Sequence, residues 1–125
     1  MLVISACEKK DETPANPLVG TWKFSSFTRS GCTDPNEDGT ETCTLTLDEC
    51  GYLVLTATTY EYHPPVGTGS AESGTYTVSG SILTSTPTGG AADDPVMYAV
   101  SGSTLTLTGS DVSSGCTEVQ VLQKQ

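Results

Sequence analysis

Short runs of alternating apolar and polar residues fill most of the chain after Leu18, and β-branched or aromatic residues dominate them. Clusters of Gly, Pro, Asn, Asp and Ser separate these runs. This pattern predicts β-strands that bury one face and are joined by turns. No long window shows the spacing of an amphipathic helix, so we expect an all-β fold.

About eight strands are expected along the chain. They cover residues 18–27, 52–56, 59–62, 74–78, 82–86, 96–100, 104–108 and 117–123. A run at 43–47 also alternates and fits either a short strand or one helical turn. The pattern of residues 76–84 returns at 98–106, which indicates two similar hairpins that follow one another in a meander.

Closure of the sheet is the next question, because an open sheet of this size leaves two unpaired edges. Long loops alternate with tight turns along the chain, as in an up-and-down barrel. A β-sandwich of the immunoglobulin type is the alternative, but it needs long crossover connections. We expect an eight-stranded antiparallel up-and-down barrel, whose interior is either filled by side chains or holds one small ligand.

Charge narrows the classes of partner. The chain of 125 residues, long enough for one domain, carries 15 acidic and five basic side chains and a net charge of −10. The bases are scattered, at Lys9, Lys10, Lys23, Arg29 and Lys124. Binding to nucleic acid or to an anionic membrane surface needs a basic patch, so both are excluded.

Residues 4–7, Ile-Ser-Ala-Cys, resemble a bacterial lipobox, in which small residues precede a cysteine that accepts a lipid. The resemblance implies that residues 1–6 are a truncated signal-peptide remnant and that Cys7 is lipidated; a chance cysteine is the alternative. Residues 7–17 would form a flexible tether to a domain at 18–125. We expect an outer-membrane lipoprotein of the cell envelope, anchored by its lipid and facing the periplasm or the cell surface.

Gly20 and Trp22, at the start of the first strand, are similar to the Gly-x-Trp signature of lipocalins. With the later strand-turn Gly-Thr-Tyr-x-Val-Ser-Gly, they make the chain resemble the small lipocalin-like domains of bacterial lipoproteins. The resemblance implies that Trp22 plugs the closed end of the barrel and that Gly20 allows close backbone approach. Alternation places Phe24 and Ser26 on the same face, so Phe24 should lie above the plug.

Two departures from lipocalins bear on the interior of the barrel. The chain is shorter, and its last strand has Lys124 as the nearest base where lipocalins pack an arginine over the tryptophan. A filled barrel is therefore the alternative to a ligand cavity. The filling residues would be Trp22, Phe24, Leu55, Tyr76, Tyr98, Leu105, Leu107 and Val121.

Four cysteines remain once Cys7 is assigned to the lipid, and in a short exported chain they indicate disulfides, with three pairings open. In an up-and-down barrel, the loop after the first strand and the start of the last strand meet at one rim. We therefore favour Cys32–Cys116 and Cys43–Cys50, each stabilising the fold by roughly 2–4 kcal/mol. A zinc site is disfavoured because these cysteines lack the tight spacing of zinc ligands.

The acidic turn at Asp34, Asn36 and Asp38 resembles the start of a calcium-binding loop, with Gly39 allowing the sharp bend. The twelfth position of such a loop needs a bidentate acid, and Leu45 stands there instead. An ordinary acidic surface turn is the alternative. Calcium is the one cofactor that the sequence raises.

Tyr60, Tyr62 and His63 precede two prolines near the expected rim. They are candidate ligand contacts, because aromatic rings grouped on a surface stack on sugars or peptides. The alternative is that the tyrosines are ordinary strand residues with one face buried.

No motif for a serine nucleophile, a phosphate loop or a dinucleotide site occurs, and we expect a protein that is not an enzyme. Glu61 and Glu118 are expected to face outward. We expect a monomeric, non-catalytic domain that binds a small or apolar ligand or an envelope protein. The alternatives are a filled module acting through its rim loops and a calcium-dependent glycan-binding or adhesion accessory. A cavity of about 300 Å³ or more would favour the ligand carrier.

Overall fold

The computed structural model describes residues 16–111 and 113–125 as an all-β domain. Cys7, residues 1–6 and most of the expected tether lie outside the described residues. Within the described part of the chain, no helix is long and apolar enough to cross a membrane.

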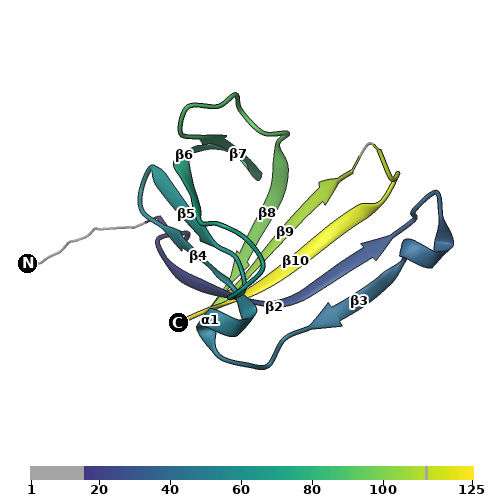
Figure 1. Cartoon of the computed structure of the whole chain (residues 1–125). Helices are drawn as coiled ribbons and strands as arrows, with labels where there is room; N and C mark the ends of the chain where they lie inside the picture. Colours follow the sequence, from purple (N-terminus) through teal and green to yellow (C-terminus); the bar gives the residue numbers. More distant parts are fainter. Residues whose placement is uncertain (1–15, 112) are drawn as a thin grey trace, which may run out of the picture.

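Nine strands and two short helical segments are found in the described residues (Figure 1). In chain order they are β2 (Gly20–Ser30), the 3₁₀-helix η1 (Pro35–Glu37), β3 (Gly39–Thr42), α1 (Leu47–Cys50), β4 (Tyr52–Leu55), β5 (Thr59–His63), β6 (Glu72–Ser79), β7 (Ile82–Pro87), β8 (Val96–Ser101), β9 (Thr104–Ser110) and β10 (Thr117–Lys124). The strands curve around one another (Figure 1).

Closure of the sheet comes from the pairing of β10 with β2, the last strand with the first. The closed wall contains β2 and β4 to β10, each antiparallel to its neighbours in the sheet. This arrangement confirms the predicted eight-stranded up-and-down barrel. The β-sandwich is excluded, because one continuous sheet closes on itself.

β2 changes partners partway along its 11 residues. Residues Gly20–Lys23 pair with β4, and the later part of β2 pairs with β3, an additional edge strand. The run at 43–47 was expected to form a strand or a helical turn; residues 43–46 connect β3 to α1, and Leu47 is the first residue of that helix. Thr46 and Glu49 form a capping box that starts α1, whereas β3 is exposed throughout and so lacks the alternation of a half-buried strand.

A β-bulge in β2 changes which of its residues face the barrel interior. Leu122 pairs with Phe24, but the residue before Leu122 pairs with Ser26, so Ser25 has no partner in β10. The prediction that Ser26 shares the face of Phe24 is therefore wrong. Phe27 takes that place, because its partner Gln120 lies two positions from Leu122, the partner of Phe24, on one face of β10.

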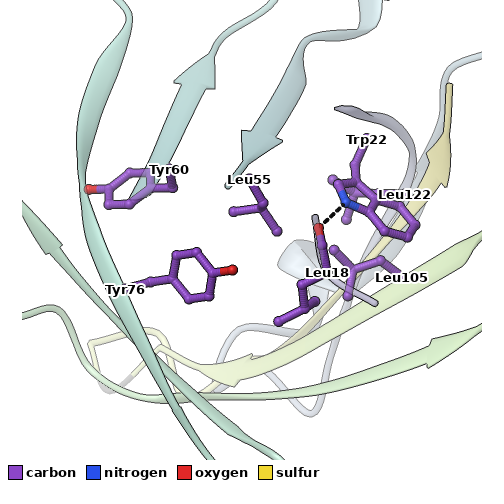
Figure 2. Close-up of a cluster of buried hydrophobic side chains, with 7 residues drawn as sticks. All are labelled: Leu18, Trp22, Leu55, Tyr60, Tyr76, Leu105 and Leu122. Atoms are coloured by element: carbon purple, nitrogen blue, oxygen red, sulfur yellow. Dashed lines mark hydrogen bonds between the residues drawn. The ribbon is translucent and has the colours of Figure 1, made fainter. Parts of the chain in front are cut away.

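The core lies at the closed end of the barrel (Figure 2). Trp22, Leu105 and Leu122 are completely buried and Leu18 is 1% exposed; we call these four residues the floor. The indole Nε1 of Trp22 donates a hydrogen bond to the carbonyl oxygen of Leu18 at 2.8 Å. Leu122 fills the place expected for Val121, because the even-numbered residues of β10 face the interior and not the odd-numbered ones. The cluster also contains Leu55, Tyr60 and Tyr76.

Lys124 covers the tryptophan of the floor. Its Nζ lies 5.7 Å from the centroid of the Trp22 ring, within range of a cation–π interaction. Gly20 makes this approach possible, since a Cβ on Gly20 would lie 2.8 Å from Cε of Lys124. The lysine thus takes the position that the resemblance to lipocalins gives to an arginine.

The structure contains the disulfides Cys32–Cys116 and Cys43–Cys50, the pairing that the sequence favours. The first spans 84 residues and joins the loop after β2 to the start of β10, at the end of the barrel opposite the floor. The second spans 7 residues and ties the end of α1 to the segment after β3. Both therefore hold parts of the molecule that strand pairing alone leaves loosely connected.

Candidate functional site

A cavity of about 360 Å³ lies between the floor and the open end, and all eight barrel strands contribute to its lining. Most of the lining is apolar or aromatic, with three polar side chains. The apolar and aromatic residues are Phe24, Leu53, Leu55, Tyr60, Tyr62, Tyr76, Leu83, Val96, Leu105 and Leu107, and the polar ones are Glu72, Ser85 and Gln120. Such a lining suits a small apolar ligand that is oriented by a few polar contacts.

Strand alternation places these side chains. In β9, Leu105 and Leu107 share one face, and their partners in the neighbouring strand β10 are Leu122 and Gln120. Leu122 is buried in the floor, whereas Gln120 lines the cavity. The same face of each strand therefore forms the floor at one end and the cavity wall further up.

Tyr60 and Glu72 form the main polar contact of the cavity wall. The Tyr60 hydroxyl donates a hydrogen bond of 2.6 Å to Oε2 of Glu72. Burial raises the pKa of Tyr60 well above its ordinary value, and the hydrogen bond and negative charge of Glu72 raise it further. Tyr60 therefore stays protonated and keeps donating to the carboxylate.

Tyr76 lines the cavity and connects it to the segment that precedes β2. Its hydroxyl donates to the carbonyl oxygen of Thr56 and accepts a hydrogen bond of 3.1 Å from Nδ2 of Asn16. Burial raises the pKa of Tyr76, an effect that the Asn16 hydrogen bond partly opposes. Asn16, at the end of the expected tether, also accepts a hydrogen bond from the backbone N–H of Leu18, so the segment before β2 is held against the barrel.

A second hollow, a groove of about 380 Å³, lies between β2, β3, α1 and β5. Phe24, Tyr62 and Gln120 line both the groove and the cavity, so these three side chains form the partition between them. Phe24 and Tyr62 meet edge to face, with ring centroids 5.8 Å apart. The groove lies where β2 changes its partner strand. β4 begins at Tyr52, which pairs with Lys23, and the pairing of β2 with β3 starts at Ser26.

The predicted aromatic platform of Tyr60, Tyr62 and His63 is wrong, because strand alternation divides these residues between two faces of β5. Tyr60 and Tyr62 line the cavity. His63 lies on the other face, stacked on Tyr52 with ring centroids 4.4 Å apart, and its Nε2 is 3.1 Å from Oε1 of Glu61. The tyrosines remain candidate ligand contacts inside the barrel, and His63 does not join them.

The acidic turn uses its carboxylates to fold the loop after β2. Oδ1 of Asp34 accepts the backbone N–H of Asn36 at 3.0 Å, which caps η1. Oδ1 of Asp38 accepts the backbone N–H of Cys32, also at 3.0 Å. These hydrogen bonds account for the turn by themselves, and calcium binding at the turn stays a prediction.

One group of described residues has the spacing of metal ligands: Glu37 beside Cys32 and Cys116. Both cysteines are joined in a disulfide, so their sulfur atoms are not thiolates. The group is a disulfide with a nearby carboxylate, and it supports no metal site.

Glu118 lies on the same face of β10 as Gln120, so the expectation that it points outward is wrong. Its Oε2 is 3.4 Å from Nε of Arg29, whose Nη2 is 3.5 Å from Oδ2 of Asp111. Hydrogen bonds from Ser113 lower the pKa of Asp111, which keeps that carboxylate charged beside the arginine. The three residues form an ion-pair cluster near the Cys32–Cys116 disulfide.

Sequence patterns did not identify the polar residues of the cavity, Glu72, Ser85 and Gln120. A signal for Glu72 was present, since it stands four positions before Tyr76 and alternation puts both on one face. It was hidden because Glu72 belongs to a Gly/Ser-rich segment that looks like a loop. Gln120 was hidden because it stands between two valines, which local alternation predicts to be the buried residues of β10.

Comparison with known proteins gives one positive finding. The family model of a lipocalin-like domain matches residues 18–111, which cover all the barrel strands except β10. No curated protein and no solved structure matches the chain.

Proposed function

The chain belongs to the lipocalin-like domain family, and we propose that it carries one small apolar ligand inside its barrel. The cavity of about 360 Å³ supports this proposal most directly. Ligand pockets in proteins range upward from about 300 Å³ and are lined mainly by hydrophobic and aromatic side chains. The size and lining of the cavity favour a carrier over a filled module that acts only through its rim.

The same proposal makes the protein a binding domain without catalysis. Among the lining residues of the cavity, the hydroxyl of Tyr60 is engaged by Glu72 and stays protonated, so it is a poor nucleophile. Ser85 donates its hydroxyl hydrogen to Asp93 at 3.0 Å, but no histidine lines the cavity to complete a serine triad. Binding is therefore the activity that these groups support.

We also propose that the protein works in the bacterial cell envelope, as an outer-membrane lipoprotein anchored through Cys7. Two observations support this location: the lipobox-like residues 4–7 and the two disulfides, which persist in oxidising compartments. Expression in a lipoprotein-producing bacterium with labelled fatty acid tests the anchor. The label should enter the parent chain and not Cys7→Ala; label in Cys7→Ala would contradict the proposal.

The proposal of a ligand carrier is tested with N-phenyl-1-naphthylamine, an uncharged apolar dye whose fluorescence increases in apolar sites. The parent should bind it with one site per chain. Leu83→Trp should abolish binding, because Leu83 is half-buried in the cavity wall and the larger ring fills the space. Leu45→Trp is the matched control, since Leu45 is 58% exposed and lies outside the cavity.

Melting curves of both variants show whether each is folded. Equal dye binding by Leu83→Trp and Leu45→Trp would place the dye elsewhere and contradict the carrier. Failure of the parent to bind the dye would favour the filled module instead.

A further inference from the structure

The charge in the cavity wall is negative. Glu72 is among its lining residues, and no lysine, arginine or histidine is. A second carboxylate, on Asp93, accepts the hydroxyl of Ser85, which also lines the cavity. A ligand entering the barrel therefore meets negative charge without a compensating base in the wall.

The bases in the described part of the chain are engaged elsewhere. Arg29 is held between two carboxylates of the ion-pair cluster, and Nζ of Lys23 donates to the carbonyl oxygen of Leu45 at 2.9 Å. Lys124 lies over the tryptophan of the floor. The net charge of −10 adds a long-range potential that attracts cations and repels anions.

Glu72 has accepting capacity left for a ligand. Tyr60 donates to Oε2, and Oε1 has no hydrogen bond to a described residue. A carboxylate accepts about four hydrogen bonds, so one neighbour leaves most of this capacity free. The hydrogen bond from Tyr60 ties Oε2 of this exposed carboxylate to the cavity wall, and Oε1 is left for a ligand.

Aromatic rings lie in the same wall as the carboxylate. Tyr62 pairs with Glu72 across β5 and β6, and the ring of Phe24 meets the ring of Tyr62. The faces of such rings attract cations, most strongly where water is excluded. The cavity wall thus combines a carboxylate and aromatic rings, and the leucines below them make the deeper part of the cavity apolar.

We infer that the ligand class of this cavity is an apolar molecule with a single cationic amine head. The inference rests on the proposed function, since it needs the cavity to hold a ligand. The apolar body lies against the leucines above the floor, and the ammonium group donates hydrogen bonds to Glu72 beside Tyr62. An apolar carboxylate of the same length is disfavoured, because its charge would face Glu72 without a base.

The test is displacement of N-phenyl-1-naphthylamine by three ligands of equal length: decylamine, decanol and decanoate at neutral pH. We expect decylamine to displace the dye at a concentration roughly three- to tenfold lower than decanol, with decanoate the weakest, as fits a partly exposed ion pair with charged hydrogen bonds. Glu72→Gln should remove the advantage of decylamine over decanol, and the dye affinity of this variant is measured directly so that its displacement values can be compared with those of the parent. Gln still accepts a hydrogen bond from Tyr60, so this variant keeps the wall intact.

Glu61→Gln is the matched control, because it removes the same charge from the outer face of β5, where the Glu61 side chain is 58% exposed. It should retain the preference for decylamine. Equal displacement by decylamine and decanol, stronger displacement by decanoate, or an equal loss of preference in Glu61→Gln would overturn the inference while leaving the carrier in place. Absence of dye binding in the parent would overturn the carrier and the inference together.

Discussion

The floor and the open end of this barrel are built from the same strands but differ in packing. At the floor, Trp22, Leu105 and Leu122 are completely buried, and short turns join the strands. Toward the open end, β2 leaves β4 for β3, and β7 and β8 share only the pairs Ile82–Met97 and Leu83–Val96. The space that the strands no longer fill becomes the cavity and the groove.

This difference indicates a division of labour along the barrel axis. At the floor, the fold is stabilised by burial of apolar side chains, because these side chains are removed from water and closely packed. The open end buries less, and there the Cys32–Cys116 disulfide and the ion-pair cluster of Arg29 connect the strands instead. Substitutions at the two ends should therefore separate stability from binding.

The largest effect is expected from Trp22→Ala. Loss of a buried aromatic side chain of this size costs roughly 3–5 kcal/mol of unfolding free energy, a large share of the roughly 5–15 kcal/mol of a typical domain. Chemical denaturation measures it, with Phe27→Ala as the control aromatic, since Phe27 is only half-buried beside the groove. A Trp22→Ala variant as stable as Phe27→Ala would remove the distinction between floor and open end.

The two disulfides should differ in their contribution. Loss of a disulfide relaxes the unfolded chain more when the closed loop is longer, so replacing both Cys32 and Cys116 by Ser should cost up to about 4–5 kcal/mol. Replacing both Cys43 and Cys50 by Ser should cost up to about 2–3 kcal/mol, because that loop is short. Unfolding of the two double variants under identical conditions gives the order, and the reverse order would mean that local strain outweighs loop closure.

A matched leucine pair compares the two ends within one strand. Leu105→Ala should cost roughly 2–5 kcal/mol, because Leu105 is fully buried in the floor. Leu107→Ala, two positions further, should cost roughly 1 kcal/mol, because its half-buried side chain faces the cavity. For each kcal/mol of stability lost, Leu107→Ala should change the affinity for the dye more than Leu105→Ala does. Equal costs for both variants would mean that the upper wall is packed like the floor.

The smallest effect concerns the alkaline side of the stability curve. Folding raises the pKa of Tyr60, so the protonated form is favoured in the folded state and its contribution is complete below the ordinary tyrosine pKa of about 10. The contribution is lost as pH rises above about 10. Tyr60→Phe should cost roughly 0.5–1.5 kcal/mol at neutral pH and should flatten this alkaline decline.

Denaturation at two pH values, one neutral and one above 10, compares Tyr60→Phe with Tyr62→Phe, which removes a hydroxyl that has no hydrogen bond to Glu72. The two variants should differ in their pH dependence. The same decline in both would mean that the Tyr60–Glu72 contact does not stabilise the folded protein.

Much of the fold could be predicted because strand signals are local. Alternation and turn residues identify β4 to β10 nearly where the structure has them, and Gly20 with Trp22 identifies the plug. The preference for Cys32–Cys116 followed from topology alone, since an up-and-down barrel must bring the first and last strands together. These inferences use spacing along one strand or the order of strands, both of which the sequence contains.

The sequence by itself therefore determined the all-β class, the closed barrel, the position of the tryptophan plug and the favoured disulfide pairing. Only the tertiary structure decided whether the interior is filled or hollow, and which polar groups reach it. A bulge at Ser25 reverses the alternation of β2, and β10 has the opposite phase to the expected one, so local periodicity cannot say which face is inside. The cavity depends on how far the strands diverge above the floor, and that separation is set by packing between residues distant in the chain.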